Sequence, residues 1–205
     1  MQAKMKYFVL LLAISLYLPN AFAWQEAETD EDSPVKVWTQ TVENSNFKAF
    51  RGQVKINAAL TKILDVIRDT ANIPKWYHNT IEAKKLNVIN EKQSLSYTVT
   101  SAPWPVTNRD SVTLVTLKPQ ENGKYIIELS ARPNKYPLQE NRIRIPKLEG
   151  FWKLVPIKEN ETEVTLQIAA EPGGEIPSWL ANSMVIDMPF YSLSNLKERV
   201  ESSTK

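Results

Sequence analysis

The sequence lacks cysteine altogether and has a single histidine, His78, in 205 residues. Without cysteine, the chain can form no disulfide, thiolate metal site or acylated lipoprotein cysteine. It also contains no G-x-S-x-G motif, no glycine-rich phosphate loop and no Cys/His pair. We therefore expect no metal site, no cofactor and no catalytic residues.

An excess of one charge is also missing. The sequence has 25 basic and 23 acidic residues, and Lys4 and Lys6 near the N-terminus account for the difference. The other basic residues are scattered along the chain rather than gathered in a stripe. This distribution argues against a nucleic acid as partner.

No apolar run is long enough to span a bilayer. The longest, residues 7–18, has twelve residues, whereas a membrane-spanning helix needs about 20. Lys4 and Lys6 precede this run, and Ala21-Phe22-Ala23 follows it as a small-residue cleavage pattern. We expect residues 1–23 to be a signal peptide that is cleaved after Ala23, and the mature protein to be exported.

The next segment, residues 24–36, is acidic and polar and has no periodic apolar face. We expect it to be a flexible acidic lead-in to a single domain that covers residues 37–202.

Alternating apolar and polar residues dominate that domain and predict half-buried strands. Leu95, Tyr97 and Val99 alternate with serine and threonine, and we expect Tyr97 to face the interior. The predicted strands cover residues 37–44, 47–56, 80–89, 93–101, 108–118, 124–131, 141–155 and 161–170. Strands with one apolar and one polar face are typical of an antiparallel sheet.

Two segments have helical periodicity instead. Residues 57–70 carry an apolar face, with Asn57 as the predicted N-cap. Residues 176–202 form a longer and more apolar helix, in which Pro189 should introduce a kink or a break. The predicted class is α+β, with a curved antiparallel sheet around the long C-terminal helix.

Four motifs carry a resemblance to a known family: NIPKWYHNT around Trp76, APWPVTNRD at 102–110, GFWKLVP at 150–156 and EPGGEIPSWLAN at 171–182. Their order resembles that of START domains, and the chain is most similar to the stand-alone bacterial branch. The resemblance implies a helix-grip fold, an internal hydrophobic cavity and non-enzymatic binding or transfer of a lipid. The bacterial resemblance also favours the periplasm, with the extracellular space as the alternative.

The resemblance further implies a gating loop between two late strands. Here the loop would be residues 132–141, with Arg132, Pro133, Tyr136 and Pro137, although an ordinary hairpin connection explains the segment equally well. Two features depart from the family. The acidic lead-in leaves little room for an N-terminal helix, and strands 93–101 and 111–118 offer no acid–base pair of the kind associated with sterol binding.

Ten residues are candidates for contact with the ligand because they are aromatic, adaptable or charged near the expected cavity. They are Tyr97, Trp104, Arg109, Trp152, Trp179, Leu180, Met184, Asp187, Met188 and Tyr191.

Each candidate also has a structural interpretation. Arg109 can meet a lipid head group or form a salt bridge or backbone clamp. Asp187 can contact the ligand, face solvent or form an ion pair. The tryptophans can simply belong to the core.

Three functions therefore stay open at the level of sequence. The first is a lipid carrier that makes transient contact with membrane surfaces. The second is a cyclase- or aromatase-like enzyme that would use Asp187 and Arg109. The third is a protein-binding domain whose cavity is filled. The sequence does not indicate an oligomeric state.

Overall fold

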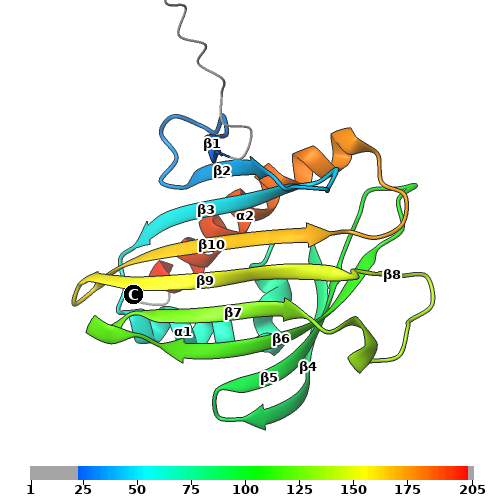
Figure 1. The fold of residues 1–205 in the computed structure, drawn as a ribbon. Coiled ribbons are helices and arrows are strands. Elements are labelled where there is room, and N and C mark those ends of the chain that lie inside the picture. The colour runs from blue at the N-terminus through cyan, green and yellow to red at the C-terminus, as the bar shows by residue number, and fades with distance from the viewer. Residues whose placement is uncertain (1–22, 203–205) are drawn as a thin grey trace, which may run out of the picture.

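The computed structural model describes residues 23–202, so the predicted signal peptide lies outside the described residues except for Ala23. Its centre is one curved sheet with strand order β1-β2-β3-β10-β9-β7-β6-β5-β4, and every pairing along this path is antiparallel (Figure 1). The strands are β1 (Gln25–Glu26), β2 (Lys36–Thr41), β3 (Lys48–Ile56), β4 (Thr80–Asn90), β5 (Gln93–Thr100), β6 (Arg109–Pro119), β7 (Tyr125–Ala131), β8 (Ile143–Arg144), β9 (Lys147–Lys158) and β10 (Glu161–Glu171).

The predicted strand 141–155 is divided in two. β8 pairs with β6 in parallel, and β9 begins only at Lys147. Pro146 separates the two strands, and proline has no N–H to donate to a sheet. The other predicted strands are confirmed to within a few residues.

Helix α2 (Ser178–Ser202) packs across the sheet and passes behind β3 and β10 in Figure 1. Close approach to β3 depends on Gly52, where an added Cβ would lie 2.6 Å from Leu193 Cδ1 and 2.8 Å from Pro189 Cβ. The helix continues through Pro189, so the break that was one of the two predicted outcomes does not occur, and the kink stays a prediction. Pro189 lies close to Gly52 of β3 at this crossing.

The shorter helix α1 (Leu60–Arg68) buries the predicted apolar face, and the 3₁₀ helix η1 (Thr70–Lys75) follows it. The N-cap is Ala59 rather than the predicted Asn57. The backbone N–H of Asn57 instead donates to Glu201 Oε1 of α2 at 2.7 Å, which ties the start of this segment to the C-terminal helix.

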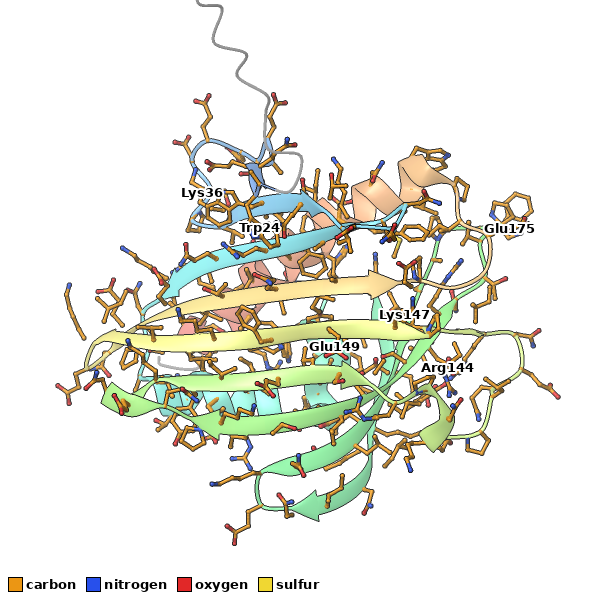
Figure 2. All side chains as sticks on the ribbon, viewed as in Figure 1. Trp24, Lys36, Arg144, Lys147, Glu149 and Glu175 are labelled. Atoms are coloured by element: carbon orange, nitrogen blue, oxygen red, sulfur yellow. The ribbon has the colours of Figure 1, made fainter. Side chains whose placement is uncertain are left out.

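The segment 24–36 is more closely attached than a flexible lead-in would be. β1 pairs with β2, Val35 is fully buried, and the Arg51 guanidinium of β3 stands 4.2 Å from the ring centre of Trp24 (Figure 2). Strand pairing and apolar burial thus attach both ends of this segment to the sheet, and the flexibility of the residues between them stays a prediction.

Within residues 23–202, no helix is both long and apolar enough to cross a membrane. The same residues contain no cluster of three or more histidine, aspartate or glutamate side chains arranged to hold a metal ion.

Candidate functional site

A cavity of about 430 Å³ lies between the sheet, α1, η1 and α2. Its volume falls in the usual range of small-molecule sites, about 300–1,000 Å³. One wall is apolar and comes from the middle of the sheet and from α2. It is built by Ile127, Leu129, Leu148, Trp152, Ile168, Ala170, Ala181, Met184, Val185 and Met188.

Another part of the cavity lining, from β5 and β6, carries a row of neutral hydroxyl groups. We call these six residues the hydroxyl wall: Ser94, Ser96, Thr98, Thr100, Ser111 and Thr113. Arg109, Val115 and Leu117 of β6 also line the cavity. The hydroxyls of Thr98 and Ser111 are hydrogen-bonded to each other at 2.8 Å. The cavity thus offers two kinds of surface, a largely apolar wall and the hydroxyl wall, whose hydroxyl groups are neutral donors and acceptors.

The hydroxyl wall reverses the predicted orientation of β5. Ser96 and Thr98 face the cavity, whereas Tyr97, although fully buried, packs with Val99 and Val112 in a separate apolar cluster on the opposite face. The cavity-lining prediction for Tyr97 is therefore corrected. Its ring is covered by Tyr136, whose centre lies 5.0 Å away.

That covering segment is the predicted gating loop. None of residues 132–141 lines the cavity. Arg144 instead fixes the segment to the outer face, because its guanidinium donates to the carbonyls of Pro133, Tyr136 and Pro137 (Figure 2). Arg132, Pro133, Tyr136 and Pro137 therefore do not line the cavity, and a gating role for this segment stays a prediction.

A buried ion pair anchors this arrangement. Arg144 donates to both carboxylate oxygens of Asp110, at 2.7 and 3.0 Å, and the Tyr97 hydroxyl donates to the same carboxylate at 3.0 Å. The side chains of Arg144 and Asp110 are 7% and 1% exposed. This acid–base pair lies under the outer segment and does not line the cavity.

Arg109 lines the cavity and is also a backbone clamp. It is 3% exposed, and it donates to the carbonyl of Thr107 at 2.5 Å and to those of Gly173 and Glu175 at 3.2 Å each. Burial lowers the pKa of Arg109 from its ordinary value. Two of these carbonyls belong to the turn that leads into α2, where Gly173 has a φ of 67° that suits glycine.

Three aromatic candidates are not in the cavity wall. Trp104 is 93% exposed, Trp179 is 71% exposed, and Tyr191 is 45% exposed and stacks on His78 at 4.8 Å. The cavity-lining predictions for these residues are corrected. Trp104 lies in the turn between β5 and β6, and Trp179 and Tyr191 occupy the outward side of α2.

The other candidates on α2 lie where the helix separates the cavity from a small surface hollow. Met184 and Met188 line both spaces, whereas Leu180 and Asp187 line only the hollow, together with His78. Burial lowers the pKa of His78, and the carboxylate of the exposed Asp187 opposes that effect. Asp187 thus meets solvent, one of the outcomes expected for it, and does not enter the cavity.

Trp152 does line the cavity, beside Trp76 at a ring separation of 5.9 Å. Trp76 was recognised in a motif but not as a lining residue. The indole Nε1 of Trp76 and the Nε of Arg109 are both buried without a hydrogen-bond partner among the described residues.

We call the solvent-exposed part of the cavity lining the mouth. Its residues are the only exposed ones in the lining described between residues 23 and 202: Arg68 from the end of α1, and Lys85, Val88, Asn90, Glu91 and Lys92 from the β4–β5 hairpin. The sequence alone does not indicate this mouth, because most of the residues that form it are polar or charged and come from separate parts of the chain.

Comparison with known proteins agrees with this architecture. Over 203 residues the chain is 40% identical to an uncharacterized protein of Pseudomonas aeruginosa, an alignment that covers 98% of this chain and 99% of that protein. A crystal structure of a STAR-related lipid transfer protein fragment from Xanthomonas axonopodis is similar, with 35% identity and a TM-score of 0.79 over 87% of this chain and 98% of that one.

An aromatase/cyclase from Streptomyces shares the fold alone, with 11% identity and a TM-score of 0.57 over 77% of this chain and 95% of that one. The family model of the START domain matches residues 16–205. The curved sheet that grips α2, the internal cavity and the family match agree with one another, and the chain belongs to the START domain family.

Proposed function

We propose that this protein binds one lipid molecule in its cavity and carries it between membranes or to a partner. The observation that supports this most directly is the cavity itself, a space of about 430 Å³ with a continuous apolar wall on β7, β9, β10 and α2. Each buried methylene contributes about 0.8 kcal/mol, so about ten methylenes provide the 8 kcal/mol that corresponds to micromolar affinity.

The size of the cavity favours a lipid with one acyl chain. Its volume of about 430 Å³ lies in the lower part of the usual range of small-molecule sites, about 300–1,000 Å³, and suits one acyl chain better than two. The unpaired donors of Trp76 and Arg109 favour a ligand with a polar group, since an unpaired buried donor costs about 1–3 kcal/mol.

The enzyme alternative finds no support in the geometry. Arg109 is occupied by three backbone carbonyls, and Asp187 lies in the surface hollow rather than in the cavity. General acid–base catalysis needs a titratable group positioned against the substrate. We therefore propose a carrier rather than a catalyst, exported on the basis of the N-terminal sequence pattern and located in the periplasm on the basis of the resemblance to bacterial START domains.

Carrier function requires contact with a membrane, and two exposed tryptophans suit that contact. Trp104 is 93% and Trp179 is 71% exposed. Their chain neighbours Pro103 and Leu180 line the same surface hollow, so the two segments are close in space. Tryptophan is enriched where proteins meet the membrane–water interface. We propose that these two side chains insert at the bilayer surface.

A vesicle experiment tests both parts of this proposal. The protein is incubated with vesicles that contain single-chain lipids, separated from them by gel filtration, and analysed for bound lipid. We expect about one lipid per protein. The Trp104→Ser/Trp179→Ser double variant should load several-fold more slowly but reach the same final amount, because neither residue lines the cavity.

The matched control is Leu138→Ser, which removes another exposed apolar side chain, 78% exposed, from the outer segment. Its loading rate should equal that of the parent. No lipid uptake by the parent would overturn the carrier proposal. Equal rates for the parent and the double variant would overturn only the role of the tryptophans.

A further inference from the structure

The charged residues that line the cavity are strongly unbalanced. Those among the described residues are Lys48, Arg68, Lys85, Glu91, Lys92 and Arg109, five cations and one anion. The whole sequence has 25 basic and 23 acidic residues, so this ratio is not a property of the chain as a whole. A cleft lined by charge of one sign concentrates ligands of the opposite sign.

Three of the five cations stand at the mouth. Arg68, Lys85 and Lys92 are exposed, and none of them forms an ion pair with any residue between 23 and 202. This distinguishes them from the nearby Lys84 and Arg142, which pair with Glu82 at 3.3 and 2.9 Å. On the outer face of the β4–β5 hairpin the cations are thus paired with Glu82, whereas Lys85 and Lys92 at the mouth have no ion-pair partner among the described residues.

The other two cations lie deeper. Lys48 is half-buried, and the guanidinium of Arg109 is engaged with three carbonyls. The part of the cavity along α2 is lined by Ala181, Met184 and Val185, which suit hydrocarbon. The lining thus changes from apolar at α2 to cationic at the mouth, with the hydroxyl wall along one side.

We propose that Arg68, Lys85 and Lys92 bind the anionic head group, a phosphate or a carboxylate, of the lipid whose single chain occupies the cavity. The inference rests on the proposed lipid-binding function and specifies the class of ligand. An anionic amphiphile matches the apolar lining at α2 and the cationic lining at the mouth. Its chain is buried beside α2, and its anionic oxygens accept hydrogen bonds from the cations at the mouth. The hydroxyl wall donates to ester or hydroxyl groups between them.

The test compares two lipids with the same chain, myristoyl-lysophosphatidate, which is anionic, and monomyristoylglycerol, which is uncharged. Both are titrated as monomers by isothermal calorimetry, so no bilayer is present and attraction to a membrane surface does not contribute. The parent protein should bind the anionic lipid at least about tenfold more tightly, a difference of about 1.4 kcal/mol. In about 1 M salt, where the Debye length is about 3 Å, the preference should largely disappear.

The Arg68→Gln/Lys85→Gln/Lys92→Gln variant should bind the two lipids with nearly equal affinity. The matched control is Lys36→Gln/Lys147→Gln/Lys153→Gln, which removes the same charge from exposed residues that do not line the cavity; Lys36 and Lys147 are labelled in Figure 2. The control should keep the preference of the parent. Myristate in place of lysophosphatidate separates a carboxylate site from a phosphate site.

The outcomes separate this inference from the proposed function. If the parent binds both lipids equally, or if the control loses the preference as the mouth variant does, the anionic site is wrong although the protein is still a lipid binder. If the parent binds neither lipid, the proposed function itself fails. Melting temperatures of both variants near that of the parent show that the comparison is made on folded protein.

Discussion

Replacing Ala170 with phenylalanine should weaken lipid binding by more than tenfold without unfolding the protein. Ala170 lies on β10, and its side chain lines the cavity. The added ring enters the space of about 430 Å³ that the lipid chain needs. Displacing as few as two methylenes removes about 1.6 kcal/mol, and 1.4 kcal/mol already corresponds to tenfold in affinity.

The neighbouring residue provides the control for this substitution. Successive side chains of a strand point to opposite faces, and Ala169 does not line the cavity. Ala169→Phe should therefore bind lipid like the parent. The measurement is the dissociation constant for a single-chain lipid, together with the free energy of unfolding of each variant. Equal weakening by both substitutions would show that the lipid does not occupy this cavity.

The substitution Asp110→Ala should lower the free energy of unfolding by about 3–5 kcal/mol. It leaves the guanidinium of Arg144, which is 7% exposed, without its carboxylate, and it removes the acceptor of the Tyr97 hydroxyl. Breaking a buried pair by removing one partner is costly because the remaining charge is desolvated and unpaired. The outer segment 132–141, which Arg144 fixes through three carbonyls, should become susceptible to proteolysis.

An exposed ion pair provides the comparison for that substitution. Lys118 and Glu128 also approach to 2.6 Å, but both side chains are 47% exposed. Glu128→Ala should therefore cost less than about 1 kcal/mol. Urea denaturation of both variants measures the two losses in the free energy of unfolding. The comparison holds when the slope of that free energy against urea concentration is the same in both variants. Similar losses for the two substitutions would contradict the view that the Asp110–Arg144 pair anchors the outer segment.

The strands and helices could be predicted because their signals are local. The alternation in β10 and the helical face of α1 depend only on neighbouring residues, and both were predicted correctly. The close approach of α2 to β3 at Pro189 could not be predicted in this way. It depends on Gly52 of β3, a residue 137 positions earlier in the chain that becomes a neighbour only in the folded protein.

The orientation of β5 shows a second limit. Alternation establishes that Tyr97 and Ser96 point to opposite faces, but it does not identify the face that borders the cavity. An apolar row is expected inside when the outer face meets water. Here the segment 132–141 covers the outer face, so Tyr97 is buried there and the serines and threonines face the cavity.

The candidate site could be predicted only in part, because residue type and alternation do not show which side chains border the cavity. Trp152, Met184, Met188 and Arg109 line the cavity, and their contact with a ligand stays a prediction. Trp104 and Trp179 are mostly exposed, and aromatic character alone does not distinguish a buried ring from an exposed one. The cations of the mouth come from α1 and from the β4–β5 hairpin, and their common position follows only from the fold.

The most direct test of a single-lipid cavity is native mass spectrometry of the protein purified from cells under mild conditions. The account predicts a population whose mass exceeds that of the protein by one lipid, and this lipid should have one acyl chain and an anionic group. Incubation of delipidated protein with membrane lipids should restore the same adduct, and Ala170→Phe should reduce it. A protein that carries no lipid, and acquires none from membrane lipid extracts, would contradict the account.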